Sequence, residues 1–289
     1  MNVSSPIGVF DSGLGGLTVA KRLLKKLPQE SMVFVGDEIH IPYGERTPQQ
    51  IKGLALGICD FLVRQNAKLI IMACNMSSAV ALSVSRELFP EVPIIGVIEA
   101  GVRALTQASS CGPIGVLATT GTVRTGAYSD TIHRFIPDAV VYEQACPLFV
   151  PLVEAGKWDS TKAEEAVREY VAPLIEKGCR TFVLGCTHYP YLADTIRKVA
   201  EVEITLVDPS EETALEASNI LQEIGKLNPQ HIEPIHNYFT SADTHRFAAL
   251  GGSFLGRDIC GVEQIIWGKD LRIIEWQEKT AEETTKSAR

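Results

Sequence analysis

The sequence predicts an α/β protein built from two similar, doubly wound domains with mainly parallel sheets. Short apolar runs rich in β-branched residues alternate with longer segments of helical periodicity, a pattern typical of parallel strands that helices cover on both faces. The expected strands begin at residues 7, 33, 69 and 94 in the first half of the chain and at 114, 140, 181 and 204 in the second. Because the intervals within the two halves are similar, they indicate an internal duplication.

Local sequence repeats support this duplication. Pro-Ile-Gly-Val occurs at 6–9 and again at 113–116. The run from Lys68 to Asn75 corresponds to the run from Arg180 to Thr187, and the penultimate residue of each run is a cysteine. Ligands of open parallel sheets bind beyond the carboxyl ends of the strands. We therefore expect equivalent strand ends of the two domains to face a single cleft that holds the active site.

The individual elements follow from the periodicity. Strands are expected at Ile7–Phe10, Val33–Gly36, Leu69–Met72, Ile94–Val97, Ile114–Leu117, Val140–Tyr142, Thr181–Leu184 and Ile204–Val207. Helices are expected at Thr47–Gln65, Met76–Leu88, Thr161–Lys177, Tyr189–Val199 and Ser210–Gly225. Ser210, which two acids follow, is expected to cap the last of these helices. The segment up to about Trp276 must pack on one domain or the other, and 277–289, which has no large apolar residue, is expected to be a polar tail.

Composition excludes several classes of protein. The 289 residues are 45% apolar and 21% charged, which excludes an intrinsically disordered chain. Apolar runs such as Leu69–Cys74 are far shorter than the roughly 20 residues that span a membrane. The formal net charge of −8 argues against a surface that binds nucleic acid. We therefore expect neither a membrane nor a nucleic acid as a partner.

The cysteines indicate a reducing compartment. The first residues lack the basic and apolar stretches of a signal peptide. The chain has seven cysteines and no CxxC pair, which indicates reduced thiols in the cytoplasm. At least five of the seven are expected to be buried small hydrophobes. Cys74 and Cys186 are the candidates for chemistry.

These two cysteines follow equivalent strands, which predicts two thiols on opposite walls of one cleft. A metal site could use Cys186 and His188, but zinc sites usually contain paired cysteines at close spacing. A single Cys–His nucleophile would leave Cys74 without a role. Racemisation employs both thiols, because one removes a proton from one face of a stereocentre and the other returns a proton to the opposite face.

Polar residues beside the strand ends suit a small substrate with a carboxylate at each end. They are Ser12, Asn75, Thr119, Thr122 and Thr187. With the main-chain amides of glycine-rich turns, they can stabilise the negative charge that develops on a carbon acid. Asp11 and His188 could carry protons to and from the thiols. The loop at 13–16 resembles a dinucleotide-binding loop, but Thr18 stands where the third glycine is required, so no cofactor is expected.

Five motifs carry a family resemblance. They are GVFDSGLGGLT at 8–18, PYGER at 42–46, ACN at 73–75, Thr119 with Gly121–Thr122, and GCTHYP at 185–190. Together they cover the chain from about residue 6 to residue 270. With these motifs the sequence resembles the aspartate/glutamate racemase family, and in particular its glutamate racemases.

The resemblance implies a cofactor-independent and metal-free interconversion of L- and D-glutamate that supplies D-glutamate for peptidoglycan. It implies Cys74 and Cys186 as the acid/base pair, and it places supporting ionisable groups at Asp11, Asp37, Glu154 and His188. It places the substrate among Ser12, Pro42, Tyr43, Gly44, Asn75, Met76, Thr119, Thr122 and Thr187. Met76 stands where the family usually has threonine, so only its main-chain contact is carried over.

The resemblance also implies the domain division and the assembly. The first domain would comprise 1–97 and 208–276, the second would be the inserted segment 98–207, and the protein would be a homodimer. Two alternatives stay open. One is a racemase of aspartate or another small acidic substrate, and the other is a non-catalytic relative that binds an anion.

Overall fold

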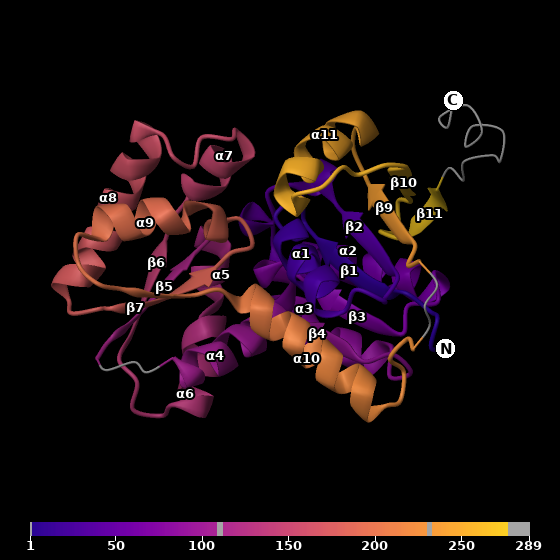
Figure 1. The fold of residues 1–289 in the computed structure, drawn as a ribbon, viewed down its shortest axis with the longest axis horizontal. Helices are drawn as coiled ribbons and strands as arrows, with labels where there is room; N and C mark the ends of the chain where they lie inside the picture. The colour runs from indigo at the N-terminus through magenta and orange to yellow at the C-terminus, as the bar shows by residue number, and fades with distance from the viewer. Residues whose placement is uncertain (1, 109–111, 230–232, 277–289) are drawn as a thin grey trace.

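Two sheets, each in its own lobe, form the framework of the protein (Figure 1). The computed structural model describes residues 2–108, 112–229 and 233–276, so the expected tail at 277–289 lies outside the described residues. The predicted α/β class with mainly parallel sheets is confirmed, because every described pair of strands except β10 with β11 is parallel.

The first sheet has the strand order β11-β10-β9-β2-β1-β3-β4 and the second has the order β6-β5-β7-β8. The strands of the first sheet are β1 (Ile7–Asp11), β2 (Met32–Gly36), β3 (Leu69–Met72), β4 (Ile94–Gly96), β9 (His236–Thr240), β10 (Glu263–Trp267) and β11 (Ile273–Trp276). Those of the second are β5 (Ile114–Ala118), β6 (Val141–Ala145), β7 (Thr181–Gly185) and β8 (Thr205–Val207). The first four strands of each half are arranged in the same order, as a duplication predicts.

Helices cover both faces of the sheets (Figure 1). In the first lobe they are α1 (Leu17–Lys26), α2 (Pro48–Arg64), α3 (Asn75–Leu88), α10 (Pro209–Glu223) and α11 (Thr244–Leu255), with the short 3₁₀ helices η1 (Glu38–His40) and η2 (Tyr43–Glu45). In the second lobe they are α5 (Thr120–Thr125), α6 (Ala127–Phe135), α7 (Phe149–Glu154), α8 (Thr161–Glu176), η3 (Tyr189–Leu192) and α9 (Ala193–Ala200). Helix α4 (Val97–Gln107) packs against both α10 and α6 and so lies between the lobes. No helix in the described part of the chain is both long and apolar enough to span a bilayer.

Several expected boundaries were wrong, most of them by one residue. Val97 is the first residue of α4, so the predicted strand from Ile94 ends one residue early. Strand β6 runs to Ala145, well past the predicted end, because it is a half-buried edge strand without a continuous apolar run. The cap of α10 is Asp208, whose carboxylate accepts a hydrogen bond from the Ser210 amide, because Pro209 occupies the first helical turn. The helix expected from residue 189 begins as the 3₁₀ helix η3 and becomes α-helical only in α9.

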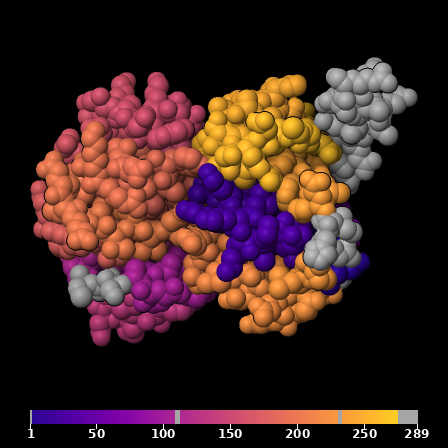
Figure 2. Space-filling view, in the orientation of Figure 1, coloured from indigo at the N-terminus to yellow at the C-terminus, as the bar shows by residue number. Residues whose placement is uncertain are grey.

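The segment after β8 packs on the first sheet. Strand β9 pairs with β2 along its whole length, and α10 packs against α1. Figure 2 shows this C-terminal segment, in orange and yellow, on both sides of the indigo N-terminal part. We therefore propose 1–97 with 208–276 as one domain and 98–207 as the other.

A buried ion pair fastens the chain where it leaves α10. Lys68 Nζ lies 2.5 Å from Glu30 Oε2 and donates a second hydrogen bond to the Lys226 carbonyl at 2.9 Å. Glu30 Oε1 accepts from the Asn228 amide at 2.8 Å. Because both side chains are buried, removing either would leave an unpaired charge in the core, which is strongly destabilising.

Candidate active site

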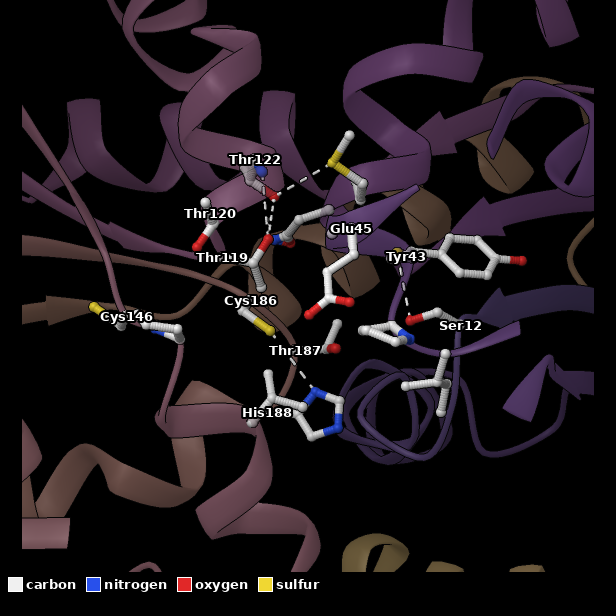
Figure 3. Close-up of a pocket in the computed structure, with 18 of the residues that line it drawn as sticks. Ser12, Tyr43, Glu45, Thr119, Thr120, Thr122, Cys146, Cys186, Thr187 and His188 are labelled. Atoms are coloured by element: carbon white, nitrogen blue, oxygen red, sulfur yellow. Dashed lines mark hydrogen bonds between the residues drawn. The ribbon is translucent and has the colours of Figure 1, made fainter. Parts of the chain in front are cut away.

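A cavity of about 360 Å³ lies between the two lobes, beyond the carboxyl ends of β1, β3, β5 and β7 (Figure 3). All predicted site residues except Asp37 line it. They are Asp11, Ser12, Pro42, Tyr43, Gly44, Cys74, Asn75, Met76, Thr119, Thr122, Glu154, Cys186, Thr187 and His188. The strand topology thus brings together residues that are far apart in the sequence.

The two cysteines occupy equivalent positions in the two lobes. Cys74 follows β3 and is the N-cap residue of α3, whereas Cys186 directly follows β7. Their exposed fractions are 6% and 8%, so both are almost shielded from bulk solvent while they line the cavity. The cavity therefore presents one buried thiol from each lobe.

On the first side, Cys74 has the environment of a protonated thiol. Burial and then the nearby charge of Asp11 raise the pKa of Cys74 to about 12. Its Sγ lies 3.8 Å from the Ser12 hydroxyl. At neutral pH this thiol keeps its proton and can act as an acid.

On the second side, Cys186 lies beside a charged histidine. His188 Nδ1 is 3.7 Å from Cys186 Sγ, and His188 Nε2 is 2.8 Å from Glu154 Oε1. Burial lowers the pKa of His188, but the hydrogen bonds to Cys186 and Glu154 outweigh it and raise that pKa to about 10. The imidazole is therefore protonated at neutral pH and can exchange a proton with Cys186.

Asp11 offers an oxygen that no protein group occupies in the described structure. Its Oδ2 accepts hydrogen bonds from the amides of Gly13 and Gly16, at 3.2 Å and 3.0 Å. Its Oδ1 is buried without a hydrogen-bond partner among the described residues. Burial raises the pKa of Asp11, and the charge of His188 partly offsets this. The arrangement suits a ligand that brings a positively charged donor.

The glycine-rich loop at 13–16 brings the two lobes close together. A Cβ on Gly15 would lie 2.4 Å from both His188 Nδ1 and Thr187 Oγ1, and a Cβ on Gly16 would lie 2.4 Å from Asp11 Cβ. Close packing around the catalytic candidates therefore requires glycine at both positions. This packing explains the glycine-rich sequence of the loop without a bound nucleotide.

Asp37, which was predicted as a supporting ionisable group, does not line the cavity itself. Its buried carboxylate is hydrogen-bonded by four side chains: Tyr43 Oη at 2.7 Å, Ser241 Oγ at 2.8 Å, His40 Nδ1 at 2.9 Å and Trp267 Nε1 at 3.0 Å. Because donors from several elements occupy this carboxylate, we propose that Asp37 positions Tyr43, which does line the cavity.

Polar side chains line the cavity beside the two thiols. Thr119 caps α5 and accepts a hydrogen bond from the Thr122 amide, and the two threonine hydroxyls are 3.0 Å apart. The Thr122 hydroxyl also lies 3.9 Å from Met76 Sδ, a weak acceptor. Asn75 Nδ2 is 3.4 Å from the hydroxyl of Tyr128, which fixes the amide. Hydroxyl and amide donors are therefore held in place by protein contacts.

Sequence reasoning missed part of the cavity wall. The additional lining residues are Ile41, Glu45, Thr120, Cys146, Pro147, Val150 and Pro151. Glu45 lies within the PYGER motif, Thr120 adjoins Thr119 of another motif, and Cys146 follows the edge strand β6, whose end was misplaced. The apolar residues offered no signal, because nothing distinguishes them from the core in the sequence.

The remaining cysteines do not all match the expectation of burial. Cys59, Cys146 and Cys179 are buried, but Cys260 is exposed because it lies in the loop after α11. Cys111 falls outside the described residues. In the described ranges, no cluster of three or more His, Cys, Asp or Glu side chains has the arrangement of a metal site.

Comparisons with known proteins agree with this geometry. The glutamate racemase of Geobacter metallireducens is 42% identical over 259 residues, which is 90% of this chain and 96% of that protein. The glutamate racemase of Desulforudis audaxviator is 42% identical over 87% of this chain and 94% of its own.

Solved structures are similar as well. The glutamate racemase of Francisella tularensis in complex with D-glutamate gives a TM-score of 0.86 at 34% identity, covering 91% of this chain and 98% of that one. The glutamate racemase of Thermus thermophilus in complex with β-chloro-D-alanine gives 0.83 at 37% identity, covering 92% and 98%. The family model described as Asp/Glu/Hydantoin racemase matches residues 7–217. This chain therefore belongs to the Asp/Glu/hydantoin racemase family.

Proposed function

We propose that this protein interconverts L- and D-glutamate without a cofactor, using Cys74 and Cys186 as the two acid/base groups. The observation that carries the proposal is the pair of buried cysteines at equivalent strand ends, both lining one cavity. The choice of glutamate is supported by the relatives named glutamate racemase, which match this chain over most of its length.

The two sulfur environments suggest a starting state for one direction of the reaction. Cys186, as a thiolate beside the His188 imidazolium, removes the α-proton from one face of the substrate. Cys74, as a thiol, gives its proton to the opposite face of the resulting carbanion. The product is the other enantiomer, with Cys186 protonated and Cys74 as the thiolate, and the reverse direction uses the opposite roles.

The residues around the thiols would hold the substrate. The unoccupied Oδ1 of Asp11 would accept a hydrogen bond from the α-ammonium group. Main-chain amides at the start of α3 and the polar side chains of Asn75, Thr119, Thr122 and Thr187 would bind the carboxylates. Such fixed donors stabilise the negative charge that develops on deprotonation, in a site largely shielded from water.

Two further features belong to this proposal. D-Glutamate made in the cytoplasm would supply peptidoglycan synthesis, and the protein would act as a homodimer. Both are supported by the sequence motifs that the chain shares with glutamate racemases.

Circular dichroism of substrate solutions tests the proposed function. With no cofactor added, L-glutamate and D-glutamate should each lose their signal completely, while L- and D-aspartate should change far more slowly. A double Cys74→Ala, Cys186→Ala variant is the control for contaminating racemases. Faster turnover of aspartate would favour the alternative substrate, and no turnover of either amino acid would refute the proposal.

A further inference from the structure

A chain of charged side chains continues outward from His188 to the surface of the other lobe. Glu154 contacts His188 through Oε1, and its other oxygen, Oε2, lies 3.6 Å from Arg246 Nη2. Arg246 Nη1 is in turn 2.7 Å from Glu38 Oε1. Glu154 belongs to α7, whereas Arg246 and Glu38 belong to the first lobe, so the Arg246–Glu154 contact crosses the boundary between the lobes, where α7 and α11 approach each other (Figure 1).

The first lobe holds Arg246 from two sides. Its main-chain amide donates to Asp243 Oδ1 at the start of α11. Its side chain is anchored on Glu38, which has an exposed fraction of only 3% and whose Oε2 accepts from the Thr240 hydroxyl at 2.8 Å. The guanidinium is a planar fork that can contact two carboxylates at once, which a lysine ammonium does less well. Arg246 is thus placed to hold Glu154 from outside the cavity.

Glu154 needs such support because of its place in the fold. It is the last residue of the short helix α7, where the partial negative charge of the helix end disfavours a carboxylate. The charged groups that face it are His188, Arg246 and Glu38. Two of these are cations on opposite sides of the carboxylate, and only His188 belongs to the same lobe.

We propose that Arg246 is a positioning residue for the Cys186 side of the active site, where it holds Glu154 on His188 across the boundary between the lobes. This inference rests on the proposed racemase function. Without Arg246, Glu154 would lose its outer contact and the imidazole would be held less firmly toward Cys186. Proton transfer through Cys186 would slow more than transfer through Cys74, because Arg246 makes no direct contact with Cys74 or with Ser12 beside it in the described structure.

The test compares Arg246→Gln with Arg246→Lys and with Arg197→Gln as a matched control. The exposed fractions of Arg246 and Arg197 are nearly equal, 52% and 53%, and Arg197 pairs with a fully exposed carboxylate, that of Asp194. Because Arg246 is half exposed, kcat/KM of Arg246→Gln should fall only about two- to fivefold. The equilibrium constant between enantiomers is one, so this fall must be the same in both directions and cannot by itself locate the defect.

The primary isotope effect, measured with each α-deuterated enantiomer, identifies which of the two proton transfers is slowed. Slower proton transfer through Cys186 makes that step more rate-limiting. Cys186→Ser identifies the enantiomer whose isotope effect depends on this step. Arg246→Gln should raise the isotope effect with that enantiomer and leave it unchanged with the other enantiomer. Arg246→Lys should recover part of the loss, and Arg197→Gln should match wild type. Equal changes with both enantiomers, or no change in Arg246→Gln, would overturn the inference.

A readout without turnover separates this inference from the proposed function. If wild type does not racemise glutamate, the proposed function fails, and NMR of the His188 imidazole nitrogens then decides the role of Arg246. The groups that face this imidazole are Cys186, Glu154 and Asp11. Arg246→Gln should broaden the resonances of the His188 imidazole whereas Arg197→Gln should not, and an Arg246→Gln spectrum identical to that of wild type would contradict the positioning role.

Discussion

The contact between Gly121 and Gly44, beside the residues that line the cavity, gives a sharp test of how the lobes fit together. Gly121 is the second residue of α5, and a Cβ at this position would lie 2.6 Å from the Gly44 carbonyl oxygen and 2.7 Å from Gly44 Cα. Both atoms belong to the backbone of the opposite lobe. In the same contact, Arg124 Nη2 donates to the Gly44 carbonyl at 3.1 Å.

The Gly121→Ala substitution should force the two lobes apart at this contact. An ordinary contact begins at 3.4 Å, so the loop and the helix must separate by roughly 0.8 Å. A misplacement of about 1 Å in an active site can cost roughly 100-fold in rate, so we expect kcat/KM to fall about 10- to 100-fold. The fold should survive, because alanine within a helix is favoured over glycine by roughly 0.5–1 kcal/mol.

The assay pairs racemisation of glutamate with thermal unfolding followed by far-UV circular dichroism. The expected result is a large loss of kcat/KM with an unfolding midpoint close to that of wild type. Arg124→Ala is the comparison, since it removes the exposed hydrogen bond in the same contact without a clash and should cost less than about fivefold. A folded Gly121→Ala variant with wild-type kcat/KM would refute the reasoning that the spacing of the lobes controls the site.

Three other predictions follow from the site. Cys74→Ser and Cys186→Ser should each reduce kcat by about 10²- to 10⁴-fold, the usual contribution of a general acid or base. Each should also raise the primary isotope effect with a different enantiomer. If both variants raised the isotope effect with the same enantiomer, the assignment of one thiol to each face would be contradicted. Tyr43→Phe should lower the free energy of unfolding by about 1.5–3 kcal/mol in urea titrations, because it removes a buried hydrogen bond to the Asp37 carboxylate. The control is Ser83→Ala, which removes an exposed hydrogen bond to Glu87, and a smaller loss in Tyr43→Phe than in this control would argue against the proposed role of Asp37. Glu154→Gln should lower the pKa of His188 from about 10. Protonated His188 stabilises the fold fully below its ordinary pKa of 6.5, and this stabilisation is lost as pH rises through 10. The difference in unfolding free energy between wild type and variant should therefore narrow between those pH values, and a difference that is constant with pH would contradict the pairing.

The sequence predicted the architecture where strands are buried on both faces. Strands β1, β3, β5 and β7 are fully buried and almost entirely apolar, and the residues that follow them form about half of the cavity wall. The half-buried edge strand β6 contains polar residues and was misplaced, because an edge strand does not need a continuous apolar sequence.

Contacts between distant segments could not be predicted in the same way. Asp37 lies at the end of a buried strand much as Asp11 does, since Asp11 is the last residue of β1 and Asp37 directly follows β2, but side chains from after β9 and from β10 surround the Asp37 carboxylate. Arg246 lies on an ordinary amphipathic helix, and only the packing of α11 beside α7 gives it a partner in the other lobe. Such roles depend on where the C-terminal segment docks, which no local pattern encodes.

Isotope incorporation in deuterium oxide tests the central claim of two opposed thiols most directly. L-Glutamate is incubated with the enzyme until a small fraction has reacted, and the α-position of both enantiomers is then analysed. If one thiol removes the proton and another, equilibrated with solvent, returns it to the opposite face, D-glutamate will carry deuterium while the remaining L-glutamate stays protiated, and the experiment started from D-glutamate will give the mirror result. Deuterium appearing equally in substrate and product at early conversion would indicate a single base and contradict the account.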